Sequence, residues 1–487
     1  MTIAQILVFS IFALLLGTLT PPRWRGWLLL GGSVLAIYWL QASTPVRNLD
    51  FWFPTTSIAL TVFVWAVTRK GESEHKDRLT LITGFIIIGL ILILGLTRYI
   101  EPICCLTPTR PPAITSLLIY VGVAAAAILV FVRLIPDRRI LSYAAVILII
   151  AIFVVLKSNN LTLTTSAWLR LRTGQPADLA LINDLPWLGF SYLAFRLLHV
   201  LRDYQSGKLP AYSLSEFVTY AIFFPTITAG PIDRSQRFVG DLRKTTAEIE
   251  PVSRLGKIKM YAQSDQLLDG GWRITWGLFK KFVLADGLAL LAINSRNAGQ
   301  VEHTLWLWVL LYAFALRLYF DFSGYTDIAL GVGRLMGFRL PENFNRPYLK
   351  TSLTAFWNSW HITLAQWFRA YYFNPLTRFL RRRNVRSMLI IFIGQVSTML
   401  LIGLWHGITW NFALWGLWHG IGLFINNRWS SWVGPRLADR GFSTRSETLL
   451  KFGGWFLTFN YVTVGWVWFA LPDVTFSLDV IRKLFGF

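Results

Sequence analysis

The sequence predicts an all-α, polytopic integral membrane protein. Three observations predict this class: the composition, the apolar runs and the absence of strand periodicity. Of the 487 residues, 54% are hydrophobic and only 15% are charged, whereas about a quarter of a soluble domain is charged. Apolar stretches long enough to cross a bilayer recur along nearly the whole chain. Apolar and polar residues do not alternate with the period of a strand, so helices are expected to span the membrane.

The apolar stretches predict about 11 to 13 full crossings. Some of the later stretches contain Arg, Asp or Pro and are expected to be broken or re-entrant. The first stretch starts at Thr2 with no basic segment and has no small-residue cleavage site before Pro21, so it is expected to be a retained helix. The predicted stretches begin near Ile3, Trp27, Phe51, Leu79, Ala113, Ile140, Pro186, Leu214, Trp272, Thr304, Leu353, Met388, Thr409 and Leu449.

The net charge of +22 has a simpler explanation than nucleic-acid binding. The basic residues are spread over many short loops, so no nucleic-acid partner is expected. In the N-terminal part they are concentrated in alternate loops, which marks the cytoplasmic side and predicts an extracytoplasmic N-terminus. The first, third and fifth loops contain Arg23, Arg25, Arg69, Lys70, Lys76, Arg78, Arg133, Arg138 and Arg139, and the second and fourth contain only Arg47, Arg98 and Arg110.

The character of the chain changes near Pro186. Up to about residue 160 it is monotonously apolar, which is typical of a scaffold. Beyond Pro186, ionisable residues stand in or beside apolar runs, and such residues face the protein interior or a wet cavity because lipid cannot solvate them. They are Arg196, His199, Asp233, Lys280, Lys281, Asp286, Arg317, Asp321, Asp327 and Arg334.

Two histidines mark a candidate site. His406 lies in the string Leu404–Gly407 inside a long apolar run, and His361 follows Trp360. Burying an imidazole is costly unless it is hydrogen-bonded or has a chemical role, so each is either a satisfied core residue or part of a site. On one straight helix His419 would be rotated by about 220° from His406, and His419 is therefore expected to be a packing residue.

Polar and aromatic residues nearby complete the candidate site. Trp357, Trp360, His361, Leu364 and Trp367 fall at helical spacing and are expected to share one face, as a packing stripe or as the wall of a dry acyl pocket. We predict that the substrate contacts Trp357, Asn358, Trp360, Trp405, Asp321 and Asn343.

Two of these residues belong to polar segments. Asp321 and Asp327 flank a Ser-Gly pair and are expected either to pair with nearby arginines or to mark a helix break. Asn343 lies in the segment Pro341–Tyr348, which contains two prolines and must be a surface loop or a cavity-lining re-entrant segment.

Two basic stretches allow two interpretations. Asp233–Gly271 and Arg378–Arg386 are either solvated faces and anchors to anionic lipid, or docking surfaces for an acidic carrier protein or a phosphorylated acyl donor. No metal site is expected, because the histidine spacing matches no zinc pattern and no cysteine lies near them. The adjacent Cys104 and Cys105 say little about the redox compartment.

An ordered set of short strings resembles the membrane-bound O-acyltransferase (MBOAT) family. The likeness is to its bacterial branch, whose members act in alginate O-acetylation and teichoic-acid D-alanylation. It extends from about Arg139 to the C-terminus, so we divide the chain into an N-terminal transmembrane scaffold, 1–138, and an MBOAT-like catalytic core, 139–487. The strings are Leu188–Tyr192, Phe223–Pro225, Ala229–Ile232, Gly277–Lys281, Ala285–Asp286, Asp321–Asp327, Asn343–Phe344, Pro347–Tyr348, Phe356–Trp357, Trp360–Ile362, Gly403–Gly407 and Trp466–Phe469.

The resemblance implies an α-helical body around a central tunnel. It also implies transfer of an acyl group, with acetyl favoured, from a cytoplasmic thioester to a hydroxyl of an extracytoplasmic polysaccharide, in a bacterial plasma membrane. The family's buried histidine falls on His406 and its second histidine on His361. The chain departs from the family where Asn358, Ser359 and Ala370 replace charged residues, which bears on acceptor and donor recognition.

The mechanism that we predict uses His406 as the general base for the attacking hydroxyl. His361 would orient the donor or hydrogen-bond the developing oxyanion. The expected partners are the acyl donor (acyl-coenzyme A or an acyl carrier protein), membrane lipids and a separate extracytoplasmic transferase, and no tightly bound cofactor is expected. A transporter or flippase without chemistry, and an inactive scaffold of an envelope complex, are alternatives that the residues leave open.

Overall fold

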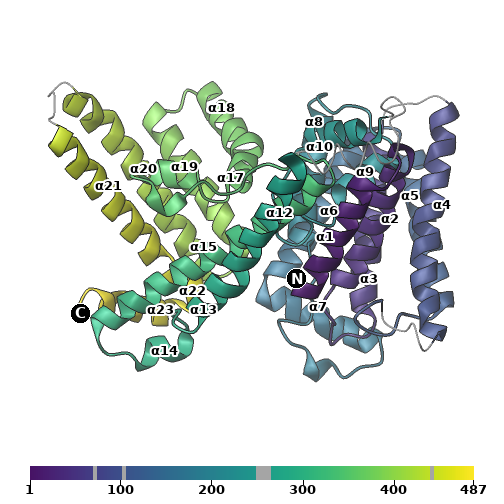
Figure 1. Ribbon diagram of the computed structural model, residues 1–487, viewed down its shortest axis with the longest axis horizontal. Coiled ribbons are helices and arrows are strands. Elements are labelled where there is room, and N and C mark those ends of the chain that lie inside the picture. The colour runs from purple at the N-terminus through teal and green to yellow at the C-terminus, as the bar shows by residue number, and fades with distance from the viewer. Residues whose placement is uncertain (70–73, 101–105, 248–264, 439–443) are drawn as a thin grey trace. The chain divides into compact units, whose positions relative to one another are not determined.

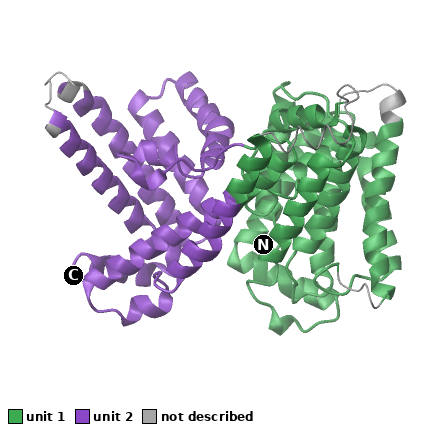
Figure 2. Ribbon diagram, viewed as in Figure 1, with its two compact units in different colours: residues 1–274, 328–340 green, residues 275–327, 341–487 purple. Residues whose placement is uncertain are grey.

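The computed structural model describes residues 1–69, 74–100, 106–247, 265–438 and 444–487. Every regular element in these ranges is helical (Figure 1), so the predicted all-α class is confirmed. The chain divides into two compact units (Figure 2): unit 1 comprises Met1–Ile274 and Ile328–Leu340, and unit 2 comprises Thr275–Asp327 and Pro341–Phe487. The predicted boundary between 138 and 139 falls inside unit 1 and remains a prediction.

The helices of unit 1 begin close to the predicted positions. The first six, each at least 16 residues long, occupy the segments where six N-terminal crossings are expected. The helices are α1 (Ile3–Thr18), α2 (Pro22–Leu40), α3 (Leu49–Thr68), α4 (Glu74–Leu96), α5 (Ile114–Leu134), α6 (Arg138–Lys157), α7 (Asn159–Arg172), α8 (Phe190–Gln205), α9 (Leu214–Ala221), α10 (Ser235–Thr246) and the first part of α12 (Asp265–Leu278).

Unit 2 combines long helices with a run of short ones. A π-helical segment, Phe279–Ala285, follows α12, and a second one, Arg369–Phe373, follows α17. The helices are α13 (Asp286–Ala289), α14 (Ser295–Gln300), most of α15 (Thr304–Leu335), α16 (Leu353–Trp357), α17 (Ile362–Phe368), α18 (Asn374–Arg382), α19 (Ser387–His406), α20 (Trp410–Ala438), α21 (Thr444–Gly465), α22 (Val467–Ala470) and α23 (Val474–Leu484).

Six of the described helices are long and apolar enough to cross a membrane. The total of about 11 to 13 crossings remains a prediction. The stretches predicted to start near Leu214 and Leu353 are short helices instead, because α9 has 8 residues and α16 has 5. Neither reaches across a bilayer. The six long helices cover Leu49–Thr68, Arg78–Tyr99, Ile114–Leu134, Arg138–Lys157, Thr304–Leu335 and Ser387–His406.

Two of the ionisable residues of α8 face the interior of unit 1, as predicted. Arg196 and His199 are each 1% exposed. The guanidinium group of Arg196 donates hydrogen bonds to the backbone carbonyl of Ala221 (2.9 Å) and to that of Thr226 (3.0 Å). These carbonyls lie at and beyond the end of α9, where helical hydrogen bonds run out. The charge therefore stabilises the end of that helix.

The described part of the first basic stretch is largely ion-paired within unit 1. Arg237 of α10 pairs with Asp233 and with Asp241, and Arg243 pairs with Glu216 of α9 at 2.6 Å. These pairs favour a structural role for α10 over a docking surface. The remainder of the stretch, residues 248–264, lies outside the described residues, as do Cys104 and Cys105.

Helices α19 and α20 form a tightly packed hairpin in unit 2 (Figure 1). A Cβ atom on Gly416 would lie 2.6 Å from the carbonyl oxygen of Met399, so the two backbones are nearly in contact. Gly403 is likewise closed off by the backbone of Phe412. The predicted close approach at Gly403 is therefore made by backbone. The premise of one straight helix through His406 and His419 is wrong, because α19 ends at His406 and α20 starts at Trp410.

Candidate active site

A cavity of about 40 Å³ within unit 2 is lined by both predicted histidines. It has room for only a few water-sized groups and is well below the usual volume of a ligand pocket. Aromatic side chains form most of the wall, so a bound ligand would be largely shielded from water. The lining residues are Leu318, Phe322, Trp357, Trp360, His361, Leu364, Ile402, His406, Trp415, Trp466 and Phe469.

The segment that supplies four lining residues is not one helix. Ser352 caps α16, which ends at Trp357, and α17 starts only at Ile362. His361 has φ 44° and ψ 52°, a left-handed conformation that few non-glycine residues adopt. The break still brings Trp357, Trp360, His361 and Leu364 to one cavity, whereas the predicted fifth member, Trp367, is not among its lining residues.

Asn343 fixes which nitrogen of His361 bears the proton. Its side-chain oxygen Oδ1 accepts from the backbone N–H of Thr363 (3.2 Å) and from the Thr363 hydroxyl (2.9 Å). A backbone N–H can only donate, so Oδ1 rather than the amide nitrogen must point this way. The same oxygen lies 3.2 Å from Nδ1 of His361. Nδ1 of the neutral ring therefore carries the hydrogen, and Nε2 presents its lone pair.

The environment of His361 leaves that lone pair available. The residue is 3% exposed, and its Nε2 has no hydrogen-bond partner among the described residues. Phe322 lies edge-on to the ring with centroids 4.8 Å apart. A buried acceptor without a partner is costly in a folded protein. A ligand hydroxyl in the cavity would relieve this cost.

His406 is the last residue of α19, where the chain leaves the helix for the turn before α20. Aromatic rings surround its imidazole: Phe469 at 4.8 Å, Trp415 at 5.6 Å and Phe412 at 5.8 Å between centroids. The helix therefore ends at the cavity wall, and His406 lines the cavity from the end of α19.

Two indole groups of the cavity wall are orphaned donors. Nε1 of Trp357 and of Trp415 are buried and have no hydrogen-bond partner in the part of the chain that the structure describes. In contrast, Nε1 of Trp466 donates to the Tyr348 hydroxyl at 3.0 Å. An indole N–H can only donate. The wall thus offers two unsatisfied donors to a ligand oxygen.

The other predicted contact residues lie elsewhere in unit 2. Trp405 packs against His406 (4.6 Å) and His361 (6.0 Å) but is not among the lining residues. Asn358 is exposed and accepts a hydrogen bond from Arg369 at 2.6 Å. Asn343 is 0% exposed and reaches the cavity only through His361. Their predicted substrate contacts remain predictions.

Asp321 and Asp327 pair with lysines, not with the arginines that the sequence analysis expected. Lys281 bonds Asp321 at 2.5 Å, and Lys280 bonds Asp327 at 2.7 Å. The lysines belong to the π-helical segment after α12. Gly324 permits the close approach, since its Cβ would lie 2.8 Å from the carbonyl of Gly277. These pairs tie α15 to this segment, and neither aspartate lines the cavity.

The sequence analysis did not select six of the lining residues, which are Leu318, Phe322, Ile402, Trp415, Trp466 and Phe469. Trp466 and Phe469 stand in the last family string, which was a signal for them. His419 lies behind the wall, 5.1 Å from the Trp357 ring and 4.9 Å from that of Trp415, and does not line the cavity. Within the described ranges, no three His, Cys, Asp or Glu residues are placed to hold a metal ion.

Comparisons with known proteins identify relatives of this chain. The chain is 34% identical over 310 residues to a teichoic acid D-alanyltransferase of Streptococcus thermophilus. The matched region covers 60% of this chain and 71% of that protein. It is 33% identical over 301 residues to a protein named as a probable alginate O-acetylase of Pseudomonas aeruginosa, covering 62% of this chain and 52% of the relative.

A third relative is a peptidoglycan O-acetyltransferase of Helicobacter pylori, 32% identical over 278 residues, covering 56% of this chain and 48% of the relative. The chain thus spans about half the length of the last two relatives. The sequence profile of the membrane-bound O-acyltransferase family matches residues 49–464, which include every lining residue except Trp466 and Phe469. The chain therefore belongs to the membrane-bound O-acyltransferase family, whose enzymes transfer acyl groups.

Proposed function

We propose that this protein transfers a small acyl group, with acetyl the first candidate, from a thioester to a hydroxyl group of a cell-envelope polymer. The observation that carries the proposal is the cavity in unit 2, which is lined by two histidines and by two tryptophans whose indole N–H groups lack partners among the described residues. The relatives support it, because their names give D-alanyl transfer to teichoic acid and acetyl transfer to alginate or peptidoglycan.

The proposed reaction needs one proton acceptor and one set of oxyanion donors. His406 takes the proton of the acceptor hydroxyl as its oxygen attacks the thioester carbonyl carbon. The carbon–sulfur bond then breaks, and the imidazolium returns the proton to the leaving thiolate. The products are an ester and a free thiol. Positioned proton transfer of this kind typically contributes about 100-fold to 10,000-fold in rate.

His361 takes a different part from the oxyanion donor that the sequence suggested. Its neutral ring presents the lone pair of Nε2, because Asn343 holds the hydrogen on Nδ1. Such a nitrogen cannot donate to an oxyanion. Because the attacking hydroxyl gives its single proton to His406, Nε2 of His361 accepts a hydrogen bond from a second hydroxyl of the acceptor and so orients the acceptor for attack.

The oxyanion donors in this proposal are Trp357 and Trp415. Both residues line the cavity, and their N–H groups lack partners among the described residues. A developing negative charge on the thioester oxygen would satisfy both. Donors fixed in advance in a site that excludes water are among the largest contributions to catalysis.

The acyl donor is a cytoplasmic thioester, either of coenzyme A or of a carrier protein, and both carry negative charge. The arginines on and after α18 are suited to bind it. Arg381, Arg382 and Arg383 have no ion pair with an acidic side chain in the described part of the chain, and all three are exposed. A separate extracytoplasmic transferase that completes delivery to the polymer is part of the same proposal.

The experiment is chemical analysis of the envelope polymers of cells with and without this protein. Loss of one ester class, restored by the wild-type gene and not by a His406→Gln variant of equal abundance, is the expected result. Isotope-labelled thioester supplied to membrane vesicles identifies the acyl group. Unchanged esters in cells lacking the protein would overturn the proposal.

A further inference from the structure

We infer that unit 1 contains a binding site for an anionic, phosphate-headed membrane lipid. The headgroup would occupy an arginine-lined cavity and one hydrocarbon chain would lie in an adjoining apolar groove. The site is independent of the acyl-transfer cavity, which belongs to unit 2.

The arginine cavity is open, polar and large, with a volume of about 710 Å³. Arg47, Arg98 and Arg110 line it together with hydroxyl and amide side chains. Within the described residues none of these arginines forms an ion pair with a carboxylate. The nearby carboxylate of Asp50 is instead bonded by the backbone and hydroxyl of Thr109 (3.0 and 2.7 Å). Among the described residues the cavity therefore has an excess of positive charge.

The loops that supply these arginines make the cluster unusual. The topology prediction places the second and fourth loops on the extracytoplasmic side, where basic residues are depleted. Arg47, Arg98 and Arg110 are the basic residues of those two loops. The structure brings all three to one cavity. The convergence of three arginines on the side where basic residues are depleted indicates a local ligand of opposite charge.

The backbone geometry of the cavity also favours an anion. The N-terminus of α3, a helix of 20 residues, starts next to Asn48, and that of α5, of 21 residues, starts next to Ala113. Asn48 and Ala113 both line the cavity. Helix N-termini carry partial positive charge and unsatisfied N–H groups. They add to the field of the three guanidinium groups.

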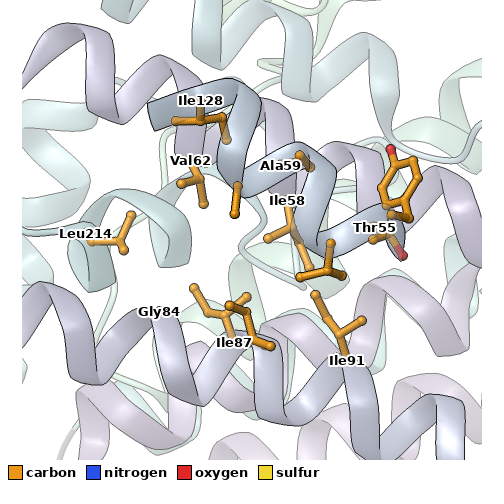
Figure 3. A pocket seen from close by; sticks show the side chains of 14 residues that line it. Thr55, Ile58, Ala59, Val62, Gly84, Ile87, Ile91, Ile128 and Leu214 are labelled. Carbon is orange, nitrogen blue, oxygen red and sulfur yellow. The ribbon is translucent and has the colours of Figure 1, made fainter. Parts of the chain in front are cut away.

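The apolar groove has a volume of about 120 Å³ and is almost purely hydrocarbon (Figure 3). Ile58, Ala59 and Val62 of α3 face Ile87 and Ile91 of α4 across it, as the side chains in Figure 3 show. A Cβ atom built on Gly84 would meet no atom within 4 Å, so this glycine opens directly onto empty space. In a membrane, a lipid chain is the ligand that such a groove takes up.

Three helices connect the two hollows. On α3, Trp52 lines the arginine cavity and Thr55 lines the groove. On α5, Ser116 lines the arginine cavity, and Tyr120, one turn later, lines the groove. The rings of Trp52 and Tyr120 pack at 4.8 Å between centroids. On the third chain segment, Ile91 of α4 lines the groove and Arg98 follows at the cavity. A polar, positively charged pocket continuous with an apolar groove has the pattern of an anionic amphiphile.

The test measures lipid binding to the purified full-length protein by native mass spectrometry. The probes are phosphatidylglycerol and phosphatidylcholine with equal chains. The wild type is expected to prefer the anionic lipid by about tenfold. The double variant Arg47→Gln/Arg110→Gln should lose that preference. Arg133→Gln, at the other end of α5, is the matched control and should retain it. A wild-type protein with no preference, or a double variant that keeps it, would overturn the inference.

The groove is tested separately with a glycine pair on α4. Gly84→Leu fills the groove and should weaken binding of both long-chain lipids about tenfold or more. Gly89→Leu also adds its Cβ in open space but lies outside the groove, so it should bind like wild type.

Inorganic phosphate serves as the third probe and distinguishes a lipid headgroup from a free ion. Two results together support the lipid site. Phosphate should compete with lipid for the wild type but not for the double arginine variant, and Gly84→Leu should weaken lipid binding. If phosphate binds but Gly84→Leu and Gly89→Leu have equal affinity for lipid, the cavity is a site for a free ion and the inference is contradicted. Because all five substitutions lie in unit 1, acyl transfer in vesicles reports separately on the proposed function.

Discussion

Asn343 decides which nitrogen of His361 can accept a proton, because Thr363 fixes the orientation of its amide. At the scale of single residues the sequence predicted His361, His406, Trp357 and Trp360, and all four line one cavity. They could be predicted because polar or bulky aromatic groups recur in short, family-specific strings. The role of Asn343 could not, since it depends on a hydrogen bond between residues 18 positions apart.

The first prediction concerns the tautomer of His361. Asn343→Leu removes the acceptor for Nδ1–H and should lower kcat by about 100-fold through loss of orientation, with a small change in KM. His361→Asn tests the same step and tolerates the left-handed backbone. In the double variant, Asn343→Leu should add little to the loss caused by His361→Asn. Fully additive losses would show that Asn343 acts on something other than His361.

The second prediction concerns the orphaned indole donors. Trp415→Phe keeps an aromatic ring and removes the N–H, so kcat should fall by about 100-fold. The control is Trp418→Phe on the same helix, because the Trp418 N–H already donates to the Tyr461 carbonyl at 3.1 Å. Its kcat should stay near the wild-type value. Equal kcat values for the two variants, each with a folded thermal transition, would exclude the oxyanion role of Trp415.

At the scale of elements, the helix breaks determine the site. Helical spacing predicted one helix face through Trp357–Trp367, and the chain breaks there between α16 and α17. Apolar periodicity continues across this break, so the local pattern gave no signal for it. The break after His406 agrees with the separate stretches predicted to begin near Met388 and Thr409, since α20 starts at Trp410. The left-handed turn at His361 and the short turn after His406 are held by tertiary contacts: Asn343 in one case, and the α19–α20 hairpin in the other.

The third prediction tests that hairpin with two substitutions on α20. Gly416→Ala should destabilise the protein by about 1 to 3 kcal/mol, because its Cβ would lie 2.6 Å from a carbonyl oxygen and 2.7 Å from the Cα of Leu400. Gly434→Ala meets no atom within 4 Å and should stabilise the helix by about 0.5 to 1 kcal/mol. Opposite shifts in thermal unfolding temperature are expected, and a shift of the same sign in both would contradict the packing described.

The fourth prediction concerns α18 and the acyl donor. Neutralising Arg381, Arg382 and Arg383 to glutamine should raise KM for the thioester about tenfold or more, leave kcat nearly unchanged, and reduce the salt dependence of KM. The matched control neutralises Arg133, Arg138 and Arg139 of unit 1. A fall in kcat at constant KM would place the arginines in catalysis and not in donor binding.

At the scale of the whole molecule, composition predicted the fold class because a bilayer forces buried backbone groups into helices. It did not predict the division into units, since α12 and α15 each contribute residues to both. The predicted orientation rests on the positive-inside bias alone.

The fifth prediction tests that orientation by labelling single cysteines in a chain with both native cysteines replaced by serine. A membrane-impermeant maleimide should label Thr2→Cys in intact cells and should label Pro136→Cys only after permeabilisation. The reverse pattern would invert the topology and place the arginine cavity on the cytoplasmic side.

The most direct test of the central claim is the rate of labelled acyl transfer from a thioester to envelope polymer in membrane vesicles, measured for wild type and His406→Gln at equal abundance and equal thermal stability. A loss of at least about 100-fold is predicted, because the hydroxyl would attack without a proton acceptor. Transfer at the wild-type rate would contradict the account and remove His406 from the chemistry.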